Sequence, residues 1–412
     1  MRILIFSYKS FDNCTYAGGG WISSLATSLS CIGHNDIAIA YPSTLYRESF
    51  SKDNITYYPI KYSFNKIKEY WFSICRKPLI YEDRDQVDNI VDDFNPDIIQ
   101  LFGLETGIGG LLSHITKYPV VVHIQGICVP CLENWFPKGF SYENVKKFYP
   151  FRLKVINATE ADYYYRFEKI ARREVENYKK YKYFFGRTEW DKEVSLYFSP
   201  DRKYYNCNEA IRSEFYMQMW KGVNKPITFT TVMNGEIYKG YDTILLVASK
   251  LRKLGLDFNW NVYGVNTDTP MVRVAENILK LRFNDCNVKF CGRKNASELS
   301  TILSNTTLYI HPSHIDNSPN SVCEAMVVGC PVIATKVGGV PSIIEDSVTG
   351  YLVPDGDTIL FANKIAKLIN DIDELNRISV NSRTIARERH NSEKIIAKLM
   401  IYYNEIIKDF KG

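Results

Sequence analysis

Two carboxylates, Asp316 and Glu324, flank a segment with the pattern of an anion-binding helix start. Residues 311–335 read in order as strand, loop, helix, turn and strand. Ser318 is a good N-cap residue, and Pro319 then falls at the first helical position, where its missing N–H costs nothing. The pattern therefore predicts a helix whose N-terminus is aimed out of the loop.

This helix start would present three backbone N–H groups, those of Asn320, Ser321 and Val322, at the positive end of the helix dipole. Glu324 lies on the same helix face as Asn320, roughly 6 Å deeper along the axis. That offset suits a diphosphate at the helix tip and a ribose hydroxyl at Glu324. The alternative is an ordinary capped helix with a surface glutamate, and the pattern alone leaves both interpretations open.

A lysine is predicted at the same edge of the sheet. Lys239 follows the strand 227–232 and so lies at a carboxyl end, as the 311–321 loop does. Arg293 follows the strand 288–291 and shares that edge, where it is a candidate contact for a base or a phosphate. Two anion-seeking features at one edge are more specific than either alone.

Metal and nucleophile chemistry have little support. A lone Cys128-x-x-Cys131 lacks the second pair or the histidines that a zinc site needs, and no GxSxG motif is present. Three acidic pairs are interpreted as solvated, so we expect no essential metal: Asp83 with Asp85, Asp355 with Asp357, and Asp371 with Asp373. Leaving-group charge would then be stabilised by fixed cations and backbone dipoles.

Strands and helices alternate along the chain, which predicts doubly wound parallel sheets in an α/β fold. The segment 221–225 is the best domain boundary because the alternation restarts after it. We expect an N-terminal Rossmann-like domain in residues 1–221, a second one in 222–385, and a C-terminal helix in 386–412 that packs back on the first domain.

Two features of the predicted first domain are weaker. Gly18, Gly19 and Gly20 lie between a strand and a helix and form either a phosphate cradle or a point of close backbone packing. His123 and Gln125 follow another apolar strand, so one of them would face a ligand cleft; a lone histidine at such a position is commonly structural.

Composition is that of a soluble globular protein. The chain has 412 residues, of which 45% are apolar and 24% charged, and its net charge of +5 does not argue for nucleic-acid binding. Its ten cysteines are scattered, which favours reduced thiols over a disulfide framework. No apolar run reaches membrane-spanning length, so we expect a cytoplasmic protein.

Residues 138–187 are basic and aromatic, with 13 Lys and Arg against 6 Asp and Glu. Such a helical segment either rests on an anionic membrane surface or is a solvated face whose aromatic residues pack on the domain. The first interpretation would place the protein peripherally at the inner face of the cell membrane.

Together these motifs resemble those of the family 4 retaining glycosyltransferases of the GT-B fold, of the bacterial polysaccharide-biosynthesis type. The resemblance rests on His311-Pro312-Ser313, Asp316 through Ser321, Glu324-Ala325-Met326, Gly329-Cys330-Pro331-Val332, Gly338-Gly339-Val340-Pro341, Gly350-Tyr351-Leu352-Val353, Lys239-Gly240 and Gly18 to Gly20. It implies two Rossmann-like domains facing a cleft.

The resemblance also implies an activity: transfer of a sugar, with retention, from a nucleotide-sugar donor to a glycan or lipid-linked acceptor. It implies that Glu324 binds the donor ribose, that Asp316 lies near the sugar and that Lys239 binds the phosphates. The intervening backbone amides would hold the diphosphate and the sugar, with Ser318, Asn320, Ser321 and Val322 as donor-binding residues. Gly19 and Gly20 are also expected to bind the donor, and Gln125 would face the cleft as a catalytic residue together with Asp316 and Lys239.

The sequence departs from the family pattern at three points: Asp316 replaces a glutamate, Gln125 replaces a histidine, and no arginine precedes Lys239, where Asn234 and Glu236 stand. These departures motivate one alternative, a non-catalytic subunit that binds nucleotide sugars. A second alternative is a nucleotide-sugar epimerase on the same fold.

Overall fold

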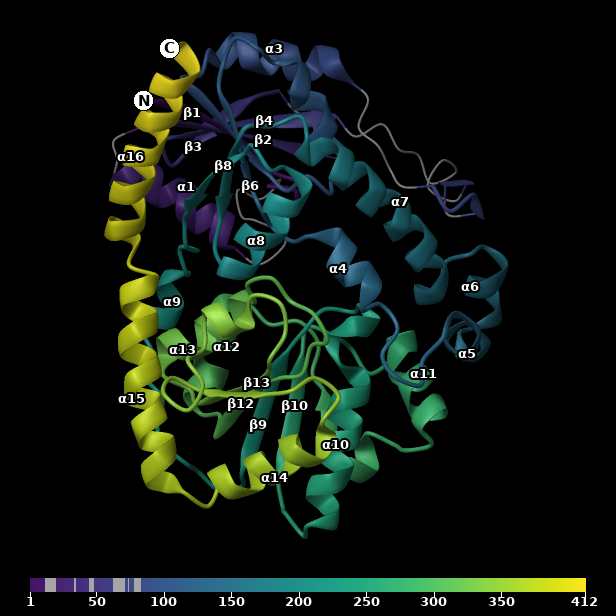
Figure 1. The fold of residues 1–412 in the computed structure, drawn as a ribbon. Helices are drawn as coiled ribbons and strands as arrows, with labels where there is room; N and C mark the ends of the chain where they lie inside the picture. The colour runs from purple at the N-terminus through teal and green to yellow at the C-terminus, as the bar shows by residue number, and fades with distance from the viewer. Residues whose placement is uncertain (12–19, 33–34, 44–47, 62–70, 73, 78–82) are drawn as a thin grey trace. The chain divides into compact units, whose positions relative to one another are not determined.

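A computed structural model describes residues 1–11, 20–32, 35–43, 48–61, 71–72, 74–77 and 83–412 of the chain (Figure 1). Gly18 and Gly19 of the predicted glycine loop lie outside these residues. The contacts divide the chain into two units, and each is built on its own sheet. This bears out the α/β class with two parallel sheets.

The first unit contains an eight-stranded sheet in the order β3-β4-β2-β1-β5-β6-β7-β8. Its strands are β1 (Arg2–Phe6), β2 (Asp36–Ser43), β3 (Phe50–Lys52), β4 (Ile55–Lys61), β5 (Ile98–Phe102), β6 (Val120–His123), β7 (Tyr183–Gly186) and β8 (Lys203–Asn206). Every neighbouring pair is parallel except β3 and β4. Residues 3–6 of β1 are completely buried, which explains their continuous apolar run.

Helices cover both faces of this sheet. They are α1 (Trp21–Cys31), α3 (Arg84–Phe94), the 3-10 helix η1 (Ile108–His114), α8 (Glu189–Phe198) and α16 (Ser392–Lys411). Two further helices cross the unit boundary: residues 130–133 of α4 (Cys128–Glu133) and residues 160–165 of α7 (Glu160–Tyr178) belong to the second unit. One core joins α1 and α16 to the sheet, and a second core lies under α3 and η1. The helix predicted at 107–115 is the 3-10 helix η1.

The second unit contains a six-stranded, fully parallel sheet in the order β11-β10-β9-β12-β13-β14. Its strands are β9 (Thr228–Val232), β10 (Asn259–Tyr263), β11 (Val288–Phe290), β12 (Leu308–His311), β13 (Val332–Thr335) and β14 (Tyr351–Val353). The strand order reverses between β9 and β12, and ligands of open α/β sheets bind at such a switch point. The loops after these two strands therefore define the place to look for a site.

The helices of the second unit are α5 (Tyr142–Phe148), α6 (Phe151–Val155), α9 (Ser213–Tyr216), η2 (Ile237–Lys239), α10 (Tyr241–Lys253), α11 (Pro270–Leu279), η3 (Asn284–Cys286), α12 (Ala296–Ser304), α13 (Asn320–Val328), η4 (Val340–Ser342), α14 (Thr358–Leu368) and α15 (Ile372–Arg389). Among the described residues, no helix of either unit has both the length and the apolar character needed to cross a membrane.

The unit boundaries differ from the predicted ones. The chain enters the second unit at Arg212 rather than at 222 and leaves it after Arg389, and residues 130–165 also belong to this unit. The stretch before the predicted linker is tied to the second unit by the Trp220 indole, whose Nε1 donates to Thr306 O at 2.7 Å. The composition at 221–225 marks a loop before β9, but the chain changes its packing partner earlier, at Arg212.

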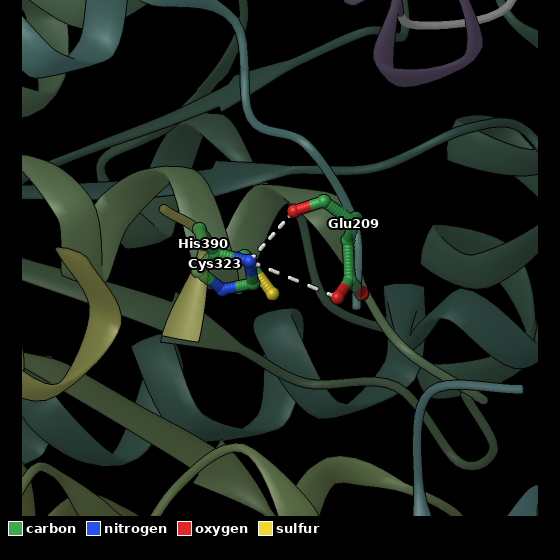
Figure 2. A group of neighbouring side chains, drawn as sticks. All are labelled: Glu209, Cys323 and His390. Carbon is green, nitrogen blue, oxygen red and sulfur yellow. Dashed lines mark hydrogen bonds and ion pairs between the residues drawn. The ribbon is translucent and has the colours of Figure 1, made fainter. Parts of the chain in front are cut away.

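The chain returns to the first unit at His390. The buried ring of His390 lies with Nδ1 2.9 Å from the carbonyl oxygen of Glu209, in the segment through which the chain left this unit (Figure 2). The Glu209 carboxylate in turn lies 3.6 Å from Arg187 Nη1. The two crossover segments are thus fastened to each other within the first unit, and α16 then packs against α1.

Half of the phenylalanine and tyrosine residues of the 138–187 segment are buried. Tyr178, Tyr181 and Tyr183 are buried, and Tyr163 and Tyr164 pack their rings against Trp135. These side chains therefore pack within their own units, as the second interpretation of the segment expects, and the membrane contact of the segment stays a prediction for its exposed residues.

Candidate active site

The predicted anion-binding helix is α13, and it begins one residue later than expected. Pro319 has an extended ψ of 108° and is itself the N-cap residue, so the buried Ser318 is not the cap. The N–H of Val322 donates to Pro319 O at 3.0 Å and is not free, contrary to the prediction. The amides of Asn320 and Ser321 remain as the first N–H groups of the helix, which have no intrahelical partner.

The loops after β9 and β12 come together at Gly240. Its φ is +93°, and a Cβ at this position would lie 2.2 Å from Pro312 O, so only glycine fits. The N–H of His314 donates to Tyr238 O at 2.8 Å and joins the same two loops. This close approach places Lys239, at the end of η2, next to the 311–317 loop.

Lys239 and Asp316, predicted separately, form an ion pair. Lys239 Nζ donates to Asp316 Oδ2 at 2.8 Å, and both side chains are 15% exposed. Burial alone would raise the pKa of Asp316, but the Lys239 charge, aided by His311 at 3.4 Å, outweighs it and holds that pKa well below its usual range. Burial would lower the pKa of Lys239, and Asp316 raises it instead. Both groups are therefore ionised at neutral pH.

The segment 130–165 supports the lysine loop from within the second unit. The Trp135 ring packs edge-on against Tyr238, with ring centroids 5.4 Å apart. The N–H of Ile237 donates to Glu160 Oε1 at 3.4 Å. The segment thus holds the residues that immediately precede Lys239.

Glu324 lies one turn into α13, as predicted, and it is almost fully buried. Its Oε1 accepts a hydrogen bond from Arg212 Nη2 at 2.6 Å. Burial raises the pKa of Glu324, and Arg212 opposes that shift. Sequence reasoning missed Arg212, which is 112 residues away; the available signal was that a buried carboxylate needs a cationic partner.

A second missed residue is His314, which binds two carboxylates. Its Nδ1 lies 2.8 Å from Asp355 and its Nε2 lies 2.9 Å from Asp242, at the start of α10. Burial would lower the pKa of His314, but the two aspartates raise it to about 10. The imidazolium therefore fixes the loop after β12 to two neighbouring segments of the site.

The acidic pairs considered as metal ligands have structural contacts. Asp83, Asp357 and Asp371 accept hydrogen bonds from backbone N–H groups at helix starts, and Asp355 contacts His314. Arg293 is exposed after β11, the edge strand of its sheet and two strands away from β9. Its predicted contact with a base or phosphate remains a prediction.

The predicted residues of the first unit lie at the strand ends and the start of α1. Gln125 follows β6, and its backbone oxygen accepts from Arg187 Nη2 at 2.8 Å. His123 is completely buried, and its Nδ1 lies 2.8 Å from Gln100 Nε2. Burial, followed by Arg187, lowers the pKa of His123 well below its usual range. Gly20 has a φ of +93° and precedes α1.

Residues 213–385 match the family described as glycosyl transferases group 1. The chain is 32% identical over 126 residues to N-acetyl-alpha-D-glucosaminyl L-malate synthase from Bacillus anthracis, covering 30% of this chain and 32% of that one. It is 24% identical over 232 residues to the amylovoran biosynthesis glycosyltransferase AmsK from Erwinia amylovora, covering 52% and 56%. The chain thus spans about a third to about half of the length of these relatives.

The solved structure of Anabaena HepE with UDP and glucose matches 98% of this chain and 99% of its own, with a TM-score of 0.65 and 15% identity. This likeness extends over both sheets, whereas the family match covers the unit that contains Lys239, Asp316 and Glu324. Residues 213–385 therefore resemble the group 1 glycosyltransferases, and the two parallel-sheet units have the GT-B fold.

Proposed function

We propose that the protein is a retaining, metal-independent glycosyltransferase that moves a sugar from a nucleotide-sugar donor to a glycan or lipid-linked acceptor. The observation that carries the proposal is the Lys239–Asp316 ion pair at the switch point of the second sheet, beside the start of α13. A preorganised cation and free amides at one place suit an anionic diphosphate.

In this proposal, Lys239 and the amides of Asn320 and Ser321 receive the leaving diphosphate. Glu324 accepts hydrogen bonds from the ribose hydroxyls, and Asp316 contacts the transferred sugar. The acceptor hydroxyl attacks the anomeric carbon from the face that the diphosphate leaves, so the configuration is retained. Because fixed cations and amides stabilise the charge that develops on the diphosphate, no divalent ion is needed.

The relatives support a sugar nucleotide as donor, since HepE was solved with UDP and glucose. Their names point to different products, since one relative is named for amylovoran biosynthesis and another is an L-malate synthase. A glycan or lipid-linked acceptor is therefore the proposal's least constrained part.

The test begins with a thermal-shift panel of UDP-, GDP-, ADP- and dTDP-sugars, because a true donor stabilises the folded state by mass action. Nucleotide release from the selected donor is then measured with and without oligosaccharide and lipid-linked acceptors, in EDTA and in Mg²⁺. NMR of the product reports the anomeric configuration. Inversion would overturn the retaining mechanism, EDTA inhibition that Mg²⁺ reverses would overturn metal independence, and Glu324→Ala should weaken donor binding.

For the peripheral membrane contact, we propose a smaller surface than the 138–187 segment. Phe151 and Val155 of α6 are 79% and 63% exposed, and Lys147 and Arg152 beside them are exposed too. Exposed apolar residues among basic ones are the composition that binds anionic lipid surfaces. This surface would place the enzyme at the inner face of the membrane.

Vesicle flotation tests this contact. The protein should float with vesicles that contain anionic lipid and remain unbound with purely zwitterionic vesicles, and Phe151→Ser with Val155→Ser should abolish flotation. Leu254→Ser, an exposed apolar residue elsewhere in the second unit, is the matched control. Equal flotation of both variants would refute the assignment.

A further inference from the structure

Arg212 is bound to the candidate ribose site by more than one contact. Its Nη2 donates to Glu324 Oε1 at 2.6 Å, and its guanidinium carbon lies 4.9 Å from the centroid of the Phe215 ring. The side chains of Arg212 and Glu324 are 19% and 7% exposed, so this pair is largely withdrawn from water. Such a pair differs from the solvated ion pairs of the surface, which contribute little.

The backbone that carries Arg212 is also fixed. Arg212 is the N-cap residue of α9, and α9 packs against α12 and α13. At the other end of α9, Arg387 Nη2 donates to Tyr216 O at 2.7 Å. The packing of α9 therefore holds the guanidinium next to Glu324.

Glu324 depends on that cation for its charge. Burial raises the pKa of Glu324, and the charge of Glu214 on α9 raises it further. Tyr309 of β12 also faces the carboxylate, but it brings no positive charge. Within the described residues, Arg212 is the only side chain found to donate a hydrogen bond to Glu324. Removing it would leave a buried carboxylate uncompensated.

We infer that Arg212 is a positioning residue for donor binding, which keeps the Glu324 carboxylate ionised and aimed for the ribose hydroxyls of a nucleoside diphosphate. The inference rests on the proposed function, because it needs Glu324 to bind the donor. It adds a residue that comes from the crossover into the second unit, outside the loops that carry the family motifs.

The experiment compares Arg212→Met, which keeps an unbranched side chain but removes the charge, with Arg212→Lys and the wild type. The probe is whichever of UDP, GDP, ADP and dTDP binds the wild type most tightly, measured by calorimetry between about pH 6 and pH 9. Losing the charged hydrogen-bond partner should weaken binding by about tenfold at neutral pH. Because the pKa of Glu324 rises further in Arg212→Met, this deficit should shrink as pH increases, and Arg212→Lys should restore much of the affinity.

A double-mutant cycle separates positioning from a general structural role. If Arg212 acts through Glu324, then adding Arg212→Met to Glu324→Gln should change affinity by less than about twofold, and the pH dependence should vanish. Arg282→Met removes an exposed arginine from an equivalent pair with Glu276 and is the matched control. It should leave affinity unchanged.

The outcomes distinguish the two proposals. If the wild type binds none of UDP, GDP, ADP and dTDP, the proposed function and this inference both fail. If it binds one of them and Arg212→Met binds equally well with an unchanged pH profile, Arg212 has no positioning role while the proposed function stands. Additive losses in the double mutant would likewise overturn the inference.

Discussion

The carboxyl ends of the strands carry different chemistry in the two units. In the second unit, Lys239 and Asp316 form an ionised pair with a 2.8 Å contact, and His314 forms another with Asp242 and Asp355. In the first unit, Arg187 after β7 also lies in a buried pair with Glu209, 3.6 Å away, but Glu105 and His123 are shifted toward their neutral forms. Burial raises the pKa of Glu105, just after β5, to about 7, and it lowers that of His123, at the end of β6, well below its usual range.

This contrast matches two tasks of the proposed reaction, which are to stabilise a charged leaving group and to bind a neutral acceptor. A diphosphate leaving group needs fixed charges that are already oriented, and such charges must be paired while they are buried. A sugar acceptor offers neutral hydroxyl groups, which neutral side chains can bind without a charge to desolvate. Under the proposed function, the second unit would stabilise the charge of the leaving group, and removing the charge of Glu105 should act in the opposite direction from removing that of Lys239 or His314.

The largest effect is expected from Lys239→Met. It removes the cation proposed for the diphosphate and leaves the Asp316 carboxylate buried without its main partner, so turnover should fall by about 10²- to 10³-fold. Turnover of the selected donor is the measurement. Lys192→Met removes an exposed lysine from a 2.9 Å pair with Glu189 and should have little effect. Wild-type turnover in Lys239→Met would end the assignment of charge handling to this site.

The next effect concerns stability. His314→Gln removes the charge between two aspartates, which should cost about 3 kcal/mol and lower the Tm by roughly 6–12 °C. His114→Gln is the matched control, because His114 pairs with Asp88 at 2.6 Å but both side chains are largely solvated. Differential scanning fluorimetry of both variants checks this, and equal small shifts would contradict it.

The contacts of His314 with the two aspartates also make stability depend on pH, with a definite sign. The pKa of His314 is raised from its ordinary value of 6.5 to about 10 in the folded state. Its contribution to stability is therefore complete below about pH 6.5 and is lost as pH rises toward 10. The Tm difference between the wild type and His314→Gln should shrink over that range, whereas a constant difference would show that charge is not the cause.

In the first unit, removing a buried charge should raise stability rather than lower it. Glu105 Oε2 is buried and has no hydrogen-bond partner among the described residues. Because folding raises the pKa of Glu105 from 4.5 to about 7, its ionisation lowers stability progressively between those values. Glu105→Gln should therefore raise the Tm at pH 8 and have little effect at pH 4.5. Glu176→Gln, at an exposed position of α7, should show neither change.

The motif residues show how far the sequence alone could reach. The sequence places Lys239 and the 311–321 loop at one edge, because parallel strands put their following loops there. The ion pair between Lys239 and Asp316 was not predicted, and the close approach at Gly240 permits it. The start of α13 was misplaced by one residue, since serine followed by proline has the composition of a capped helix. Only the extended backbone of Pro319 shows that the helix begins later.

The ion-pair partners that come from other elements of the fold could not be predicted from the sequence. Arg212 and His314 have no local pattern, because each acts through residues brought close only by the folded sheet. The assignment of residues 130–165 to the second unit was missed for the same reason, since the packing of Trp135 on Tyr238 leaves no periodic signal. Local patterns predicted the elements and their edges, whereas the ion pairs depended on tertiary contacts.

The smallest effect is expected at Gln125, the proposed catalytic contact of the first unit. The fold uses its backbone oxygen, which accepts from Arg187, while its side chain makes a long 3.4 Å contact with His123 O. Gln125→Ala should therefore keep the Tm of the wild type. A single neutral hydrogen bond to the acceptor would be lost, so turnover should fall by about 2- to 10-fold. A loss as large as that of Lys239→Met would mean that the first unit carries charge-dependent chemistry, and the contrast between the units would fail.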